Sequence, residues 1–166
     1  SPASSLSTSA RVRRAIRNSG RSSSRSAGVS HSASSAAPTA ARAASAGASR
    51  SGNDLTRIGA GPAAKGDAID IKGMVVDPEG RSIADARVEI WQTDVQGIYL
   101  HPGDSNMKRR DMAFQFYGET KADTAGAFTF RTIIPARYPG RARHIHVKIT
   151  PPGGPTLTTQ LYFKGD

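Results

Sequence analysis

Short segments in which apolar and polar residues alternate, separated by turn residues, fill most of the chain after residue 53. An alternation of period two is typical of strands, because successive side chains of a strand point to opposite faces of the sheet. No segment shows the 3.6-residue periodicity of an amphipathic helix. We predict strands at residues 69–76, 86–91, 114–119, 127–132, 144–149 and 157–163. Strands that follow one another without helices indicate an all-β sandwich or barrel rather than βαβ units.

Residues 1–52 differ from the rest of the chain, because they consist mainly of Ser, Ala, Arg and Gly and contain no aromatic residue. The first fifty residues hold eight arginines and no acidic residue, so they carry most of the net charge of +10. Such a low-complexity segment cannot bury enough apolar surface to offset the entropy of ordering it, and we expect a disordered tail. A targeting segment and an out-of-frame reading of a GC-rich gene are alternative explanations. Nucleic-acid binding is disfavoured, because interleaved aromatic residues and a recognition fold are both missing.

Residues 53–166 are expected to form one domain, for which about 110 residues suffice. The sequence has no cysteine, which excludes disulfides and thiolate ligands and leaves nitrogen and oxygen to hold any metal. No stretch approaches the roughly 20 consecutive apolar residues of a membrane span, and without a convincing signal peptide we expect a cytoplasmic location by default. The chain stops at Asp166, straight after the last predicted strand, where the fold would be expected to continue, as in a fragment that lacks C-terminal strands.

A His-x-His pair is the strongest local indication of chemistry. His144 and His146 lie two apart in a predicted strand, so both side chains leave the same face and one metal ion could take both. Such pairs also occur at polar surfaces and in structural hydrogen bonding. Tyr138 lies just upstream, before a Pro-Gly turn, and Tyr99 follows an earlier turn. Taken singly, each tyrosine is more typical of a core or rim residue.

Three blocks of the sequence together resemble one known family. Residues 71–99 read IKGMVVDPEGRSIADARVEIWQTDVQGIY and resemble the signature segment of the intradiol ring-cleavage dioxygenases, the family of protocatechuate 3,4-dioxygenase and catechol 1,2-dioxygenase. The matching residues include Gly73, Gly80, Glu89, Gly97 and Tyr99. Residues 130–149 and residues 158–166 resemble the segments that follow in that family, in the same order. The resemblance implies an antiparallel β-sandwich.

The resemblance also implies an iron(III) site with four protein ligands, namely Tyr99, Tyr138, His144 and His146. A phenol has a reference pKa of about 10, and a hard trication can displace its proton more readily than a dication can. Arg141 matches the arginine that family members place beside the substrate, and Gln160 matches a glutamine behind the metal ligands. His101 and Arg143 are expected near the site without an assigned role.

The activity implied is cleavage of a catecholic ring between its two hydroxyls with O2, giving a cis,cis-muconate-type diacid without a reductant. Tyr138 would leave the metal as the substrate docks and act as a base. Only five residues separate Tyr138 from His144, so the natural catechol is left open. A homo-oligomer is compatible with the family. The alternative is a non-catalytic transthyretin-like or carboxypeptidase-regulatory-like binding module, which gives no reason for two tyrosines and a His-x-His pair in this order.

Overall fold

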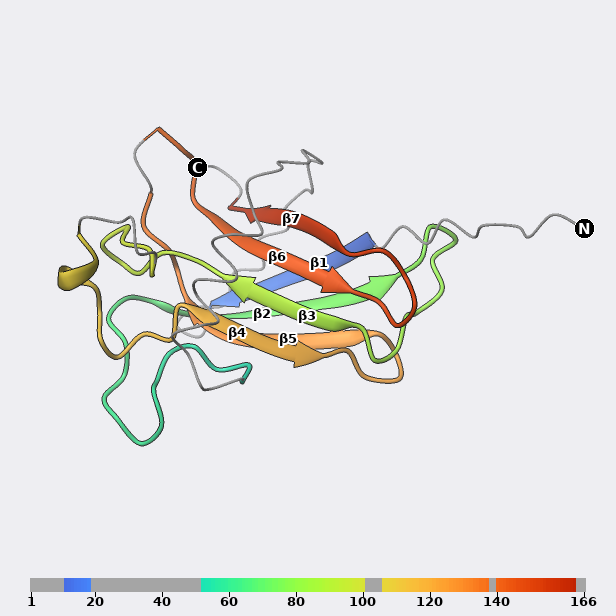
Figure 1. Cartoon of the computed structure of the whole chain (residues 1–166), viewed down its shortest axis with the longest axis horizontal. Helices are drawn as coiled ribbons and strands as arrows, with labels where there is room; N and C mark the ends of the chain where they lie inside the picture. Colours follow the sequence, from blue (N-terminus) through green and yellow to red (C-terminus); the bar gives the residue numbers. More distant parts are fainter. Residues whose placement is uncertain (1–10, 19–51, 101–105, 138–139, 164–166) are drawn as a thin grey trace, which may run out of the picture.

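Two antiparallel sheets packed face to face make up the fold (Figure 1). The computed structural model describes residues 11–18, 52–100, 106–137 and 140–163. Within these ranges the elements are β1 (Arg11–Asn18), β2 (Ala68–Val76), β3 (Arg87–Trp91), the 3-10 helix η1 (Met107–Arg109), β4 (Tyr117–Lys121), β5 (Ala127–Ile133), β6 (His144–Thr150) and β7 (Leu157–Tyr162). No helix in the described ranges is long and apolar enough to cross a membrane.

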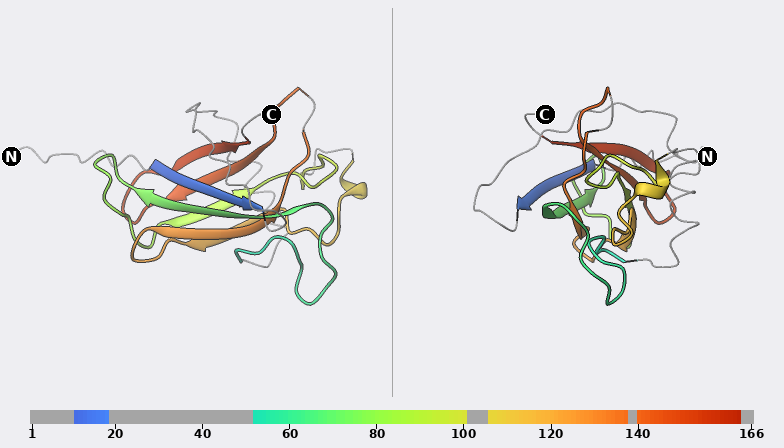
Figure 2. Two further views of the ribbon diagram at one scale, coloured as in Figure 1. Left: turned by 180° about the vertical axis from the view of Figure 1, so that it is seen from behind. Right: turned by 90° about the vertical axis from the view of Figure 1, so that its left-hand side faces the viewer.

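The strand order is β1-β2-β5 in one sheet and β4-β3-β6-β7 in the other, and every neighbouring pair is antiparallel. Figure 2 shows the molecule from behind, with the three-stranded sheet nearer to the viewer. The predicted all-β sandwich is therefore confirmed, and each of the six predicted strands is present. β4 begins at Tyr117 rather than at residue 114, because the preceding chain bonds elsewhere: Gln115 N–H donates to the Leu55 carbonyl at 2.9 Å.

Strand β1 lies in the low-complexity segment and was not among the predicted strands. It pairs with β2 from Arg11 opposite Val76 to Asn18 opposite Ile69. The other residues of the segment, apart from Gly52, lie outside the described ranges, so the expectation of a disordered tail stays a prediction.

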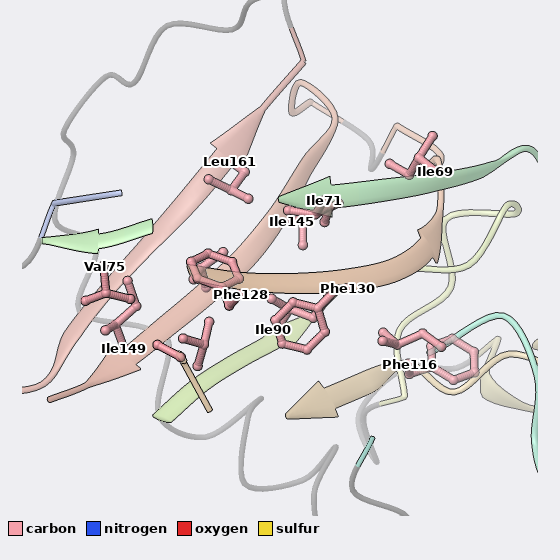
Figure 3. Close-up of a cluster of buried hydrophobic side chains, with 14 of the residues drawn as sticks. Ile69, Ile71, Val75, Ile90, Phe116, Phe128, Phe130, Ile145, Ile149 and Leu161 are labelled. Atoms are coloured by element: carbon pink, nitrogen blue, oxygen red, sulfur yellow. The ribbon is translucent and has the colours of Figure 1, made fainter. Parts of the chain in front are cut away.

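Inward-facing apolar side chains from both sheets form the core (Figure 3). They include Ile69, Ile71 and Val75 of β2, Val88 and Ile90 of β3, Phe128 and Phe130 of β5, and Ile145, Val147 and Ile149 of β6. Gly73 is opposite Phe128, and a Cβ at Gly73 would lie 2.4 Å from the phenylalanine ring, so glycine is required for this packing. Because side chains alternate along each strand, the residues between the core positions of β3 and β6 face outward from the four-stranded sheet.

Candidate metal centre

Polar and aromatic side chains from three neighbouring strands meet on the outward face of the four-stranded sheet. Trp91 of β3 lies opposite His146 of β6, and His146 lies opposite Gln160 of β7. His144 lies opposite Tyr162. Directly opposed residues on one face of an antiparallel pair are about 5 Å apart, so this register brings the His-x-His pair together with its neighbours. The predicted sharing of one face by the two histidines is confirmed.

Tyr99 reaches this face from the loop that leaves β3, at the end of the sandwich where the long loops gather (left in Figure 1). Its hydroxyl oxygen is 3.3 Å from Nε2 of His144 and 3.2 Å from Nε2 of His146. One phenolic proton cannot serve both ring nitrogens at once. The Tyr99 oxygen and Nε2 of each histidine, three atoms that can bind a metal, thus lie close together.

The hydrogen bond of His144 to the main chain determines which of its two ring nitrogens is unprotonated. Nδ1 of His144 lies 2.9 Å from the carbonyl oxygen of Ala142, and a carbonyl only accepts, so Nδ1 carries the proton. Nε2 is then left unprotonated and directed at the Tyr99 hydroxyl, the arrangement found in histidines that bind metals.

The spacing of the donor atoms fits a common metal ion. Atoms about 2.1 Å from one ion are about 3.0 Å apart at a right angle and about 3.4 Å apart at a tetrahedral angle, and the two Tyr99 distances lie within that interval. In the described part of the chain no three His, Asp or Glu side chains group in a way that could hold a metal. A metal centre here therefore needs the tyrosine oxygen.

The surroundings of His146 keep its imidazole neutral. Burial, with smaller contributions in the same direction from His144 and Arg141, lowers the pKa of His146 to about 4. Only a neutral imidazole can bind a metal, so this side chain is ready for ligation at neutral pH. Trp91 supports it from one side: the two rings stack with centroids 4.9 Å apart and planes within 1°.

On the other side of His146 lies the amide of Gln160, with its nitrogen 3.5 Å from Nδ1. The hydroxyl of Tyr162 donates to the carbonyl oxygen of the same amide at 2.5 Å. The chain Tyr162–Gln160–His146 thus ties the second histidine to the last strand.

A cluster of paired charged side chains lies beside these residues on the same sheet. Glu89 is 4% exposed, receives the hydroxyl of Tyr117 at 2.9 Å, and forms an ion pair with Lys148 at 3.0 Å. Burial raises the pKa of Tyr117, and its hydrogen bond to Glu89 raises it further. Arg87 donates to Glu119 at 2.6 Å, and this hydrogen bond lowers the pKa of Glu119. Each acidic group in the cluster has a cationic neighbour.

The structure brings together Tyr99, His144 and His146 and places Gln160 beside them, as the sequence predicted. Arg141 is exposed on the segment leading into β6, near enough for its charge to act on His146. Tyr138 and His101 lie outside the described residues, so their predicted places stay predictions.

Sequence reasoning missed Trp91 as part of the site. The signal was present, because in ARVEIW the residues Val88 and Ile90 alternate with Arg87, Glu89 and Trp91. A tryptophan on the polar face of a strand that pairs with the His-x-His strand is a candidate neighbour of the metal.

Comparisons with known proteins found similar sequences and structures. A family model described as "Dioxygenase" matches residues 42–166. The beta chain of protocatechuate 3,4-dioxygenase from Burkholderia cepacia is 34% identical over 109 residues, which are 61% of this chain and 46% of that protein. The crystal structure of 3-chlorocatechol 1,2-dioxygenase from Rhodococcus opacus 1CP is 30% identical with a TM-score of 0.52, covering 67% of this chain and 49% of that one.

The fold alone is also shared with the intradiol ring-cleavage dioxygenase from Tetranychus urticae, at 23% identity and a TM-score of 0.56, over 71% of this chain and 60% of that one. The chain spans less than half the length of the curated relatives that it matches.

Proposed function

The chain belongs to the intradiol ring-cleavage dioxygenase family, and from that premise we propose that it opens a catechol-type ring between the two hydroxylated carbons with O2 at an iron(III) ion. The observation that supports this most strongly is the convergence of the Tyr99 oxygen with Nε2 of His144 and Nε2 of His146. Tyr138 is proposed as the fourth ligand on the family resemblance.

The donor set favours iron(III) over other metals. Zinc prefers Cys, His and carboxylate ligands, and iron(II) oxygenases of the facial-triad type use two histidines and a carboxylate. Phenolate oxygens suit a hard trication instead. When bound, iron(III) would activate the deprotonated catechol ring for reaction with O2.

The residues of this chain would orient the ligands and move protons. Ala142 fixes the tautomer of His144, and Trp91 fixes the ring plane of His146. If the Gln160 amide turns over, its carbonyl accepts Nδ1–H of His146, its NH2 donates to Tyr162, and Nε2 of His146 is left for the metal.

Two further residues would act on the substrate. The phenolate of Tyr138 would accept a proton from one catechol hydroxyl as the substrate docks. Arg141 would stabilise the negative charge that develops on the ring, because its guanidinium cannot be deprotonated near neutral pH. The product would be a cis,cis-muconate-type diacid containing both oxygen atoms of O2. Relatives named for protocatechuate and for 3-chlorocatechol suggest which catechols to assay first.

The metal ligands can be tested by absorption spectroscopy of protein loaded with iron(III). Tyrosinate bound to iron(III) gives a visible charge-transfer band, and we expect the Tyr99→Phe variant to lose most of it. Tyr117→Phe is the matched control, because Tyr117 is a buried tyrosine on the same sheet face that bonds to Glu89 rather than to the histidines. A fully loaded, colourless wild-type protein would contradict the ligand assignment.

The reaction can be tested by oxygen uptake with catechol, protocatechuate and hydroxyquinol, while ultraviolet absorbance reports muconate-type products. We expect uptake of one O2 per ring opened. Yellow semialdehyde products would show cleavage outside the two hydroxyls and would refute the proposed reaction.

A further inference from the structure

One type of turn occurs three times among the residues that the structure describes. An Asp-x-x-Gly sequence forms it at Asp77–Arg81, Asp94–Ile98 and Asp123–Ala127. In each copy the aspartate N–H donates to the carbonyl four residues later, and the glycine N–H donates back to the aspartate carbonyl. The glycines have φ of 87°, 79° and 74°, a region that other residues rarely adopt.

Two of the copies share the same side-chain bonds. Oδ1 of Asp94 accepts the N–H groups of Gln96 at 2.8 Å and of Ile98 at 3.0 Å. Oδ1 of Asp123 accepts the corresponding N–H groups, two and four residues further on, at 2.9 and 2.8 Å. Asp123 can therefore serve as an internal control, because it forms the same turn away from the metal centre. It lies in the β4–β5 connection, at the opposite end of the sandwich (Figure 1).

Asp94 differs from Asp123 in its burial and its further partners. Asp94 is 0% exposed, whereas Asp123 is exposed. Oδ2 of Asp94 accepts the N–H of Asp111 at 2.9 Å, and its main-chain carbonyl accepts the N–H of Ala136 at 3.1 Å. One residue thus joins three segments that are far apart in the sequence.

The segment that leads to Tyr99 is bonded along its length to the segment that leads to Tyr138. Gln92 donates from its amide to the carbonyl of Ile133 at 2.9 Å and accepts the hydroxyl of Thr132 at 2.9 Å. Further along, the glycine of the same turn contacts the other segment closely. A Cβ at Gly97 would lie 3.2 Å from the main-chain oxygen of Arg137, the residue before Tyr138.

We propose that Asp94 is the positioning residue of the metal centre, and that its turn sets the separation between Tyr99 and the chain entering Tyr138. The inference rests on the proposed function, since it concerns the two tyrosine ligands. Its physical basis is that one buried carboxylate accepts three main-chain N–H groups, and hydrogen bonds to an ionised acceptor are about twice as strong as neutral ones. Tyr99 directly follows Ile98, whose N–H is one of these three, and therefore has little freedom to move.

The matched experiment compares Asp94→Asn with Asp123→Asn in the full chain. An amide has only one acceptor oxygen, so the amide of Asp94→Asn cannot accept both the N–H groups of its own turn and the N–H of Asp111. In Asp123→Asn one acceptor oxygen is sufficient, because Oδ1 of Asp123 accepts both N–H groups of that turn. We expect Asp94→Asn to weaken iron(III) binding about 10- to 100-fold, the usual effect of losing a group that orients ligands. We also expect its visible band to shift, while Asp123→Asn leaves both the affinity and the band unchanged.

A second pair of variants separates positioning from folding. A Cβ at Gly126 would lie 2.5 Å from the Val75 carbonyl oxygen, closer than the corresponding contact of Gly97. Gly126→Ala should therefore lower the melting temperature more than Gly97→Ala does. Iron(III) affinity should follow the reverse order, with the larger loss in Gly97→Ala.

The outcomes are distinguishable. If iron affinity simply follows the melting temperature across the four variants, or if Asp94→Asn matches Asp123→Asn, the turn has only a structural role and the inference is overturned. If wild-type protein binds no iron(III) and shows no visible band, the proposed function itself is overturned, and the inference with it.

Discussion

Replacement of Trp91 by leucine would show how much the metal centre depends on the aromatic ring behind His146. Trp91 is 1% exposed and stacks on the imidazole at a centroid distance of 4.9 Å. A tryptophan buries about 150–250 Å². If leucine fills about half of that space, the loss of about 100 Å² at about 25 cal/mol per Å² lowers the free energy of unfolding by about 2.5 kcal/mol. Loss of the stacked pair adds about 1 kcal/mol, for a total of about 3.5 kcal/mol.

Trp91→Phe is the control for this substitution, because it keeps a ring beside His146. We expect its free energy of unfolding to fall by about 1 kcal/mol, mainly from the smaller buried area. Urea unfolding should be followed by circular dichroism, since Trp91 is the only tryptophan and its variants lose that fluorescence.

The same two variants test positioning of the metal ligand. Without a stacked ring, His146 can rotate about its side-chain bonds, so Trp91→Leu should bind iron(III) about tenfold more weakly than Trp91→Phe. Equal iron affinities in both variants would refute a positioning role for the stack. A change in unfolding free energy below about 1 kcal/mol for Trp91→Leu would refute the packing argument.

Three further predictions concern the charges around the site. Arg87 holds the pKa of Glu119 below its usual 4.5, so the stability that this pair contributes is complete above pH 4.5 and is lost as the pH falls further. Urea midpoints measured from pH 6 to 3 should therefore fall less in the Arg87→Met variant than in the wild-type protein. Lys148→Met leaves the buried Glu89 with one cation fewer and should lower the free energy of unfolding by about 2 kcal/mol, with partial recovery when Glu89→Gln is added. Arg141→Gln should lower kcat/KM for ring opening about 100-fold with an unchanged visible band, and a band change instead would move Arg141 from the substrate to the metal.

Strand periodicity carried most of the fold prediction, because alternation depends only on which side chains face the core. It placed β6 correctly and with it the shared face of His144 and His146. It failed at β4, where Phe114 and Phe116 are buried from an irregular segment, since burial in a loop leaves no periodic trace. β1 was missed because a strand poor in large apolar residues has no pattern to detect.

The candidate site, like the fold, was only partly predictable from the sequence. Periodicity cannot trace the path of a loop, so Tyr99 was assigned through the family resemblance alone, and the structure then brought it to the histidines. The Asp-x-x-Gly turns are visible in the sequence, but only the tertiary structure shows that Asp94 is the buried copy and Asp123 the exposed one. Contacts between residues near in sequence could be predicted, whereas the distant contacts of Asp94 with Asp111 and Ala136 could not.

The alternation of β6 also limits how proteins of this design can diverge. His144 and His146 point outward, while Ile145 and Val147 point into the core. A single inserted residue between them would exchange the two faces, turning an imidazole into the apolar core and an isoleucine out of it. Insertions and deletions should therefore accumulate in residues 134–143, which connect β5 to β6, where a change of length leaves the histidines in register. New substrate preferences in such a sandwich would then arise from loop length, with the strand sequence held nearly constant.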